Sequence, residues 1–89
     1  MKITFDPVKR AVTLQDRSLD FADAPLVFAG PVLEIEDDRR DYTRIRTIGY
    51  LGVRMVMVVW TPRNKARHII SMRHCNDRER KTYGPRLSK

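Results

Sequence analysis

A run of seven residues, RMVMVVW at 54–60, is the feature that most constrains the fold of this 89-residue chain. Six consecutive apolar side chains in an extended segment point to both sides of a sheet, so both sides must be covered. Such a strand lies in the middle of a sheet rather than at its edge. The sequence therefore predicts a sheet with residues 54–60 as its central strand.

Shorter stretches of alternating or β-branched residues predict the partner strands. They are residues 2–5, 32–36, 42–50 and 67–73. Gly52 and the segment 61–66 are predicted turns that join the last three strands as hairpins. Hairpin connections of this length require antiparallel pairing, because parallel strands need longer crossovers.

Capping residues and helical periodicity predict two helices in the first third of the chain. Asp6 is a suitable N-cap, and Pro7 suits the first position of a helix that runs to residue 17. The residues expected to form its core face are Val8, Ala11, Val12 and Leu14. Asp20 is the expected N-cap of a second helix over 21–29.

A third helix is predicted at the C-terminal end. Asn76 and Glu79 have the spacing of a capping box, in which each side chain accepts from the other residue's backbone N–H. Residues 84–89, GPRLSK, are expected to form a frayed tail. The predicted order is β-α-α-β-β-β-β-α. We therefore expect one α+β domain over residues 1–89, with an antiparallel sheet and its helices packed on one face.

The charge is uneven along the chain. The formal net charge is +7; residues 1–40 contribute −2 and residues 41–89 contribute +9. A segregated basic half indicates a polyanionic partner, which is nucleic acid, a membrane surface or an acidic protein. The single cysteine, Cys75, excludes an internal disulfide. Because no apolar run reaches the roughly 18 residues of a membrane helix, no membrane association is expected and the expected location is the cytoplasm.

Metal and cofactor chemistry find little support in the sequence. His68 and His74 are six residues apart and have no carboxylates in metal-ligand spacing. The acidic segment 34–38 has the ligands for a hard cation, but it is also typical of a solvated bend. Cys75 next to His74 has the neighbours of a reactive thiol, yet a packed thiol is the simpler interpretation. No cofactor and no metal site are predicted.

The remaining chemistry is that of cations on a sheet. Alternation places Arg44 and Arg46 on the same face of the strand at 42–50. Arg73 on the last strand is expected to point from that face, with His74 at its rim. RNA carries its own nucleophile, the 2′-hydroxyl, so cations that stabilise the phosphate and a group that transfers protons suffice for cleavage. The alternative is that these arginines are only solvated charges.

Two long segments resemble the BrnT family of toxins. The first, FDPVKRAVTLQDRSLDFADAPLVF, is similar to the opening of that family. The second is GVRMVMVVWTPRNKARHIISMR, followed by RER and Tyr83. In it, an apolar strand ends in a Thr-x-Arg turn, and an Ile-Ile-Ser-x-Arg strand and an Arg-Glu-rich helix follow. The resemblance covers nearly all of residues 3–83.

The resemblance implies a ribonuclease with a RelE-like fold, the toxin half of a type II toxin–antitoxin pair that arrests growth by cutting RNA. It further implies a BrnA-like antitoxin with a ribbon-helix-helix DNA-binding domain. That antitoxin would bind the toxin in a hetero-oligomer, and the complex would repress the shared operon by contacting operator DNA. RNA is the implied substrate.

The site expected from the cationic pattern and the resemblance has two groups of residues. The expected catalytic residues are Arg46, Arg73, His74 and Tyr83. The expected RNA-binding residues are Lys9, Arg17, Arg44, His68, Ser71, Arg78 and Arg80. The sequence departs from the family at Asp16-Arg17-Ser18, where many members have Lys-His-Gly. It also lacks an acidic residue before Arg44, and His74-Cys75 stands where Lys-Ala is frequent. These departures favour an alternative, a non-catalytic basic module that binds nucleic acid.

Overall fold

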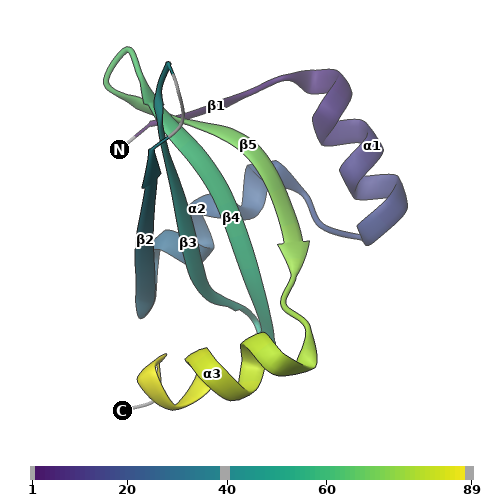
Figure 1. Cartoon of the computed structure of the whole chain (residues 1–89). Coiled ribbons are helices and arrows are strands. Elements are labelled where there is room, and N and C mark those ends of the chain that lie inside the picture. Colours follow the sequence, from purple (N-terminus) through teal and green to yellow (C-terminus); the bar gives the residue numbers. More distant parts are fainter. Residues whose placement is uncertain (1, 39–40, 88–89) are drawn as a thin grey trace.

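The fold is α+β and has one mixed five-stranded sheet, in a computed structural model that describes residues 2–38 and 41–87 (Figure 1). The elements in chain order are β1 (Ile3–Phe5), α1 (Pro7–Arg17), the 3-10 helix η1 (Phe21–Asp23), α2 (Ala24–Ala29), β2 (Val32–Asp38), β3 (Thr43–Leu51), β4 (Arg54–Arg63), β5 (Ala66–His74) and α3 (Asp77–Leu87). The expected α+β class is confirmed. The RelE-like arrangement stays a prediction.

The strand order in the sheet is β1-β5-β4-β3-β2, so the apolar strand β4 is central as predicted. The three pairs among β2, β3, β4 and β5 are antiparallel. The prediction of an entirely antiparallel sheet was wrong, because β1 pairs with β5 in parallel. These two strands are separated by most of the chain, so no hairpin constrains their relative direction.

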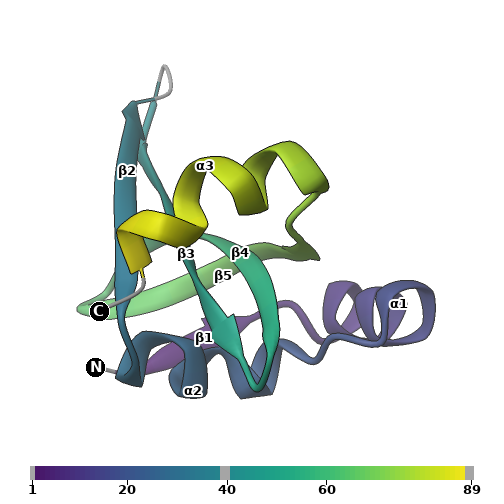
Figure 2. The ribbon, with the colours of Figure 1, turned by 90° about the horizontal axis from the view of Figure 1, so that it is seen from below.

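Two hydrophobic clusters lie on opposite faces of the sheet (Figure 2). Phe21 and Val27, from η1 and α2, pack with Val58 and Trp60 on one face. On the other face, Leu87 of α3 packs in the cluster that contains Ile48, Met57 and Val59. The prediction that the helices pack on one face was therefore wrong. A central strand that is apolar on both sides needs cover on both sides.

Helix α1 has the predicted N-terminus but the opposite orientation. Asp6 Oδ1 accepts from the backbone N–H of Val8 at 2.9 Å, as expected of an N-cap. The apolar face expected to enter the core instead faces solvent, and α1 has no buried residue. Polar contacts hold the helix: Arg10 pairs with Asp20 at 2.7 Å and its guanidinium lies over the ring of Phe5.

The β4–β5 hairpin is longer than predicted. The segment 61–66 was expected to be a turn, but β4 continues to Arg63 and β5 begins at Ala66. The turn is only Asn64-Lys65, both with positive φ, which fits the twist of a two-residue hairpin. A bulge interrupts the pairing further along: Val59 pairs with Ser71 and Trp60 with Ile69, so Ile70 has no partner residue.

Helix α3 begins at the predicted capping box and extends further than expected. Glu79 donates its backbone N–H to Asn76 Oδ1 at 2.8 Å, and Asn76 donates its own to Glu79 Oε1 at 3.0 Å. Residues 84–87 were expected to be frayed, but they continue the helix to Leu87, whose side chain is buried. Burial of this leucine holds the last turn against the sheet; residues 88–89 lie outside the described part. No helix in that part has the length and apolarity to cross a membrane.

We expect Leu87→Ala to lower the free energy of unfolding by about 2–5 kcal/mol, because it leaves a cavity in the cluster under α3. Leu26→Ala on α2 is the matched control, since Leu26 is 64% exposed and its truncation should cost less than about 0.5 kcal/mol. Urea denaturation measures both values. Equal effects of the two substitutions would mean that residues 84–87 are not held as described.

Candidate functional site

Strand register brings Arg46 and Ser71 to the face of the sheet that α3 partly covers. Arg46 pairs with Val59, and Val59 pairs with Ser71, so the three lie in one row across β3, β4 and β5. The neighbouring row contains Ile48, Met57 and Arg73. The expectation that Arg46 and Arg73 point from the same face agrees with this register.

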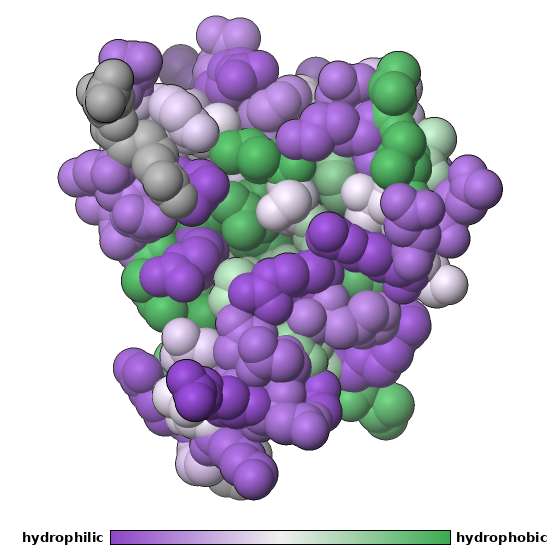
Figure 3. Space-filling view, turned by 45° about the vertical axis from the view of Figure 1, so that its right-hand side comes forward, coloured by the Kyte–Doolittle hydropathy of each residue, from purple (hydrophilic) through white to green (hydrophobic). Residues whose placement is uncertain are grey.

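A pocket of about 430 Å³ lies toward the other end of this face, beyond Ser71. It is formed by α1, the connection between β2 and β3, and strands β4 and β5. Its lining residues are Lys9, Tyr42, Thr61, Pro62, Arg63, His68 and Ile70. Figure 3 shows hydrophobic residues near the centre of the molecule framed by hydrophilic ones. The lining therefore contains apolar side chains, the phenol ring of Tyr42, the cations Lys9 and Arg63, and the imidazole of His68.

His68 is the titratable group of this pocket. Its Nδ1 lies 2.8 Å from Thr4 Oγ1, across the parallel pair of β5 and β1. Burial lowers the pKa of His68 below its ordinary value of 6.5, and the cations Arg63 and Lys9 lower it further, against a small opposing effect of Asp6. The imidazole is therefore neutral at pH 7. When Nδ1 donates to Thr4, Nε2 carries a lone pair available to a ligand.

Several cations on this face form no ion pair within residues 2–38 and 41–87. Lys9, Arg63 and Arg46 are the three, although Arg46 is close enough to Glu79 to help lower the pKa of that carboxyl, and the Nε of Arg46 is buried without a hydrogen-bond partner. Arg44 differs, since its Nη2 lies 3.3 Å from Asp37 Oδ2. Unpaired cations at the edge of a concave surface attract anions, and arginine matches the geometry of a phosphate.

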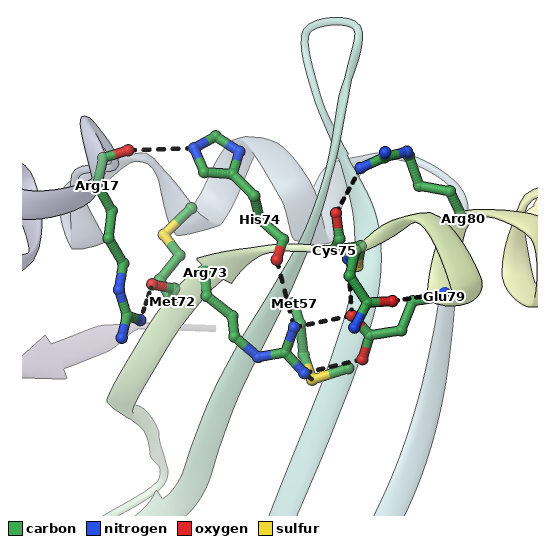
Figure 4. Close-up of polar contacts among 9 residues, drawn as sticks. Arg17, Met57, Met72, Arg73, His74, Cys75, Glu79 and Arg80 are labelled. Atoms are coloured by element: carbon green, nitrogen blue, oxygen red, sulfur yellow. Dashed lines mark hydrogen bonds and ion pairs between the residues drawn. The ribbon is translucent and has the colours of Figure 1, made fainter.

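Arg73 is held by an ion pair at the junction of β5 and α3 (Figure 4). Its two terminal nitrogens donate to the two carboxylate oxygens of Glu79, each at 2.8 Å, and Nη2 also lies 3.4 Å from the sulfur of Met57. The hydrogen bonds from Arg73 lower the pKa of Glu79 to about 2. The guanidinium is thus engaged by Glu79, in a position that is still partly exposed.

His74 and Arg17 form a separate contact between the end of β5 and the end of α1. His74 Nε2 lies 3.1 Å from the carbonyl oxygen of Arg17, and Arg17 Nη1 donates to the carbonyl oxygen of Met72 at 3.0 Å. In Figure 4, His74 points toward α1 while Arg73 points toward α3. Adjacent residues of one strand point to opposite sides, so His74 and Arg73 do not form one site.

The remaining predicted residues belong to α3 and its start. Arg80 donates to the carbonyl oxygen of Cys75 and pairs with Asp77, whereas Arg78 is exposed. Tyr83 is half-buried against the cluster under α3. Burial raises the pKa of Cys75 to about 11, so its thiol is a packed, neutral group, as the simpler interpretation held.

Comparison with known families gives one match over most of the chain. The family model described as "Ribonuclease toxin, BrnT, of type II toxin-antitoxin system" matches residues 5–79. The chain belongs to the BrnT family. A search of curated proteins gives no match. An antitoxin partner and an RNA substrate are implied by this type II family.

In this BrnT-family chain the eleven predicted site residues divide among four places. The sheet face with the pocket brings together Lys9, Arg44, Arg46, His68 and Ser71. The others lie at the Arg73–Glu79 ion pair, at the Arg17–His74 contact, or on α3. Three groups near His68 were not predicted: Thr4, Tyr42 and Arg63. Arg63 was missed because β4 was ended too early; the alternation Thr61, Arg63 would have placed it on the same face.

The acidic segment at 34–38 forms most of the edge strand β2 rather than a bend. Within residues 2–38 and 41–87, no group of three or more His, Cys, Asp or Glu side chains is placed to hold a metal ion. Three of the acidic side chains interact with neighbours on β3 instead: Glu34 accepts from Thr47, Asp37 pairs with Arg44 and Asp38 accepts from Thr43.

We expect the Arg73–Glu79 pair to make stability depend on pH. Because the folded pKa of Glu79 lies below its ordinary value of 4.5, its stabilisation is complete above pH 4.5 and is lost as the pH falls toward 2. Glu79→Gln should lower the free energy of unfolding at pH 7 by about 1–2 kcal/mol, less than the full shift implies, because of solvent screening. The Arg73 side chain is 39% exposed.

Urea denaturation between pH 2 and pH 7 measures this effect. The difference between the parent chain and Glu79→Gln should shrink toward zero near pH 2. Asp77→Asn is the control at the same helix start, because its carboxylate is 85% exposed and should contribute little at any pH. A Glu79→Gln difference that stays constant with pH would contradict the proposed origin of the stabilisation.

Proposed function

We propose that this chain is a metal-independent endoribonuclease that acts in the cytoplasm, causes growth arrest and is neutralised by a BrnA-like antitoxin. The membership of the BrnT family supports the toxin and ribonuclease parts of the proposal. The observation that carries the chemistry is one pocket lined by the imidazole of His68, whose pKa is lowered, and by two cations, Lys9 and Arg63, that form no ion pair within the described residues. Such a pocket combines a base with groups that bind a phosphate.

In the proposed reaction, the phosphate of the RNA backbone lies against Lys9 and Arg63. His68 Nε2 removes the proton of the adjacent 2′-hydroxyl, whose oxygen then forms a bond to phosphorus. The bond from phosphorus to the 5′-oxygen breaks, and the hydroxyl of Tyr42 donates a proton to that oxygen. The products are a 2′,3′-cyclic phosphate and a 5′-hydroxyl, and proton exchange with water restores both side chains.

The cations stabilise the charge that accumulates on the pentacovalent phosphate, which is the main electrostatic contribution to such reactions. Lys9 and Arg63 are the nearest candidates, and Arg46 lies on the same face with its Nε unsatisfied. Among the residues expected from the sequence, we assign Arg46 to transition-state stabilisation. Arg73 would contribute to transition-state stabilisation only if its ion pair with Glu79 broke. We therefore assign Arg73, and Tyr83 beside it, to the attachment of α3 to the sheet.

The proposed partner is a BrnA-like antitoxin with a ribbon-helix-helix domain. Domains of that kind bind DNA as dimers, so the complex contains at least two toxin chains and binds the operator of the shared operon. The basic half of the chain, with its net +9, supports an acidic inhibitory segment on the antitoxin. We expect the antitoxin gene to adjoin the gene for this chain.

A second function has one observation in its favour. Two of the four expected catalytic residues, Arg73 and His74, make contacts inside the protein. A chain with that arrangement and without the frequent Lys-His of the family could bind RNA without cutting it. RNA binding with a steep dependence on salt and no cleavage would select this function.

The test of the proposed function is expression under a tightly regulated promoter, together with RNA cleavage by the purified chain with and without EDTA. We expect growth arrest and cleavage that persists in EDTA. Cleavage that EDTA abolishes would refute metal independence, and the absence of both toxicity and cleavage would refute the enzyme.

We expect His68→Asn to lower the cleavage rate by roughly 10²–10⁴-fold, because it removes the general base. The parent rate should rise with pH through a pKa below 6.5 and then level off, and this rise should be absent in the variant. His74→Asn is the matched control, since His74 is the other histidine and its ring bonds to the carbonyl oxygen of Arg17, away from the pocket. A larger loss in His74→Asn than in His68→Asn would move the site to the end of α1.

A further inference from the structure

Helix α1 presents its apolar residues to solvent and is attached to the rest of the protein through the polar side chains of Arg10 and Arg17. Val8, Val12 and Leu14 are 70%, 52% and 45% exposed, and Ala11 between them is also exposed. At 100° per residue these four residues share one side of the helix, which we call the α1 stripe. Hydrophobic residues are visible at the right-hand edge of Figure 3, the side on which α1 projects in Figure 1.

The outward direction of the α1 stripe is fixed by bonds on the opposite side of the helix. Arg10 donates to both carboxylate oxygens of Asp20, at 2.7 and 3.0 Å, and Arg17 donates to the carbonyl oxygen of Met72. His74 adds a contact to the last carbonyl of the helix. Turning the stripe inward would break these contacts and bury charged groups, which is costly. The exposed apolar face is therefore built into the fold.

We propose that the α1 stripe is the docking surface for an amphipathic helix of the partner antitoxin, with acidic residues along one edge. This inference rests on the proposed toxin function, which supplies the partner. An apolar row spaced by three and four residues is complementary to another helix. The charge at one edge of the stripe is also complementary, because Lys9 lies there and forms no ion pair within residues 2–38 and 41–87.

Two other occupants fit the surface less well. An eleven-residue helix is only about 16 Å long, so contacts at the α1 stripe alone bury far less than the roughly 1,000 Å² of a stable interface, and the occupant must add contacts elsewhere, as an antitoxin that also reaches the pocket does. Two copies of net charge +7 also repel each other. A lipid-bound helix directs its basic residues toward headgroups, whereas Arg10 is engaged by the protein itself.

Docking at the α1 stripe would also regulate the pocket. Lys9 belongs to the lining of the pocket that contains His68, and its backbone lies on α1 next to the stripe. An acidic residue on a helix bound to the stripe reaches the lysine that we assign to the RNA phosphate. The antitoxin thus competes with RNA for one cation while it gains most of its binding energy from apolar contacts outside the pocket.

The test measures binding of the purified antitoxin encoded by the adjoining reading frame, by titration calorimetry, to three forms of this chain. Val12→Asp should weaken binding by on the order of 10- to 100-fold, because it places an unpaired charge in the apolar contact. Leu26→Asp is the matched control, since Leu26 of α2 is 64% exposed against 52% for Val12, and it should change binding by less than about twofold. Circular dichroism verifies that both variants fold.

RNA cleavage by each free variant is measured in parallel and should equal that of the parent chain. Equal binding by Val12→Asp and Leu26→Asp would overturn the docking proposal, and so would the absence of antitoxin binding by the parent chain. Self-association or binding to anionic vesicles that Val12→Asp abolishes, without an effect on antitoxin binding, would assign the stripe to another occupant. Failure of the proposed function is distinct, because it appears as a parent chain that does not cut RNA.

Discussion

The bidentate ion pair between Arg73 and Glu79 determines which half of the sheet face is covered and which half is open. The same carboxylate accepts the backbone N–H of Asn76, so one group both begins α3 and attaches it to the end of β5. From that point α3 lies over the end of the sheet where Ile48 and Met57 form a cluster. The end with Arg63 and His68 is left for a ligand.

The position of the imidazole depends on a contact between the two ends of the chain. Thr4 is on the three-residue strand β1, and His68 is sixty-four residues later on β5. Their parallel pairing orients the ring, and α1, which follows directly, brings Lys9 to the same pocket. Helix α1 therefore contributes to the site through Lys9 in its first turn. Its contacts with the rest of the protein are polar because its apolar side faces solvent.

Features set by neighbouring residues were predictable from the sequence, and features set by distant ones were not. The caps at Asp6, Asp20 and Asn76 and the central place of β4 follow from local chemistry and were predicted correctly. The periodicity of α1 identified its apolar side but could not indicate what would cover it. The parallel pairing of β1 required knowledge of contacts across the whole chain.

The candidate site shows the same limit. Arg44 and Arg46 share one face because strand alternation is a local rule, but His68 and Ser71 share it only because of the bulge at Ile70, and Lys9 comes from α1. Thr4, which contacts the imidazole, and Arg63, which helps lower its pKa, come from other strands and were missed. Glu79 was recognised as part of a capping box, but its second partner, Arg73, is fixed only by the packing of α3 on β5.

Ile70 is the extra residue of the bulge in β5. The number of residues in this segment constrains the fold more than their types do. Ile69 and Met72 both enter the cluster beneath α2, although they are three positions apart, because Ile70 adds one step to the strand. Without that step, Met72 and Arg73 would exchange sides: a methionine would meet Glu79 and an arginine would enter the core. Chains of this architecture should therefore tolerate changes of residue type in this segment far better than a change of its length by one.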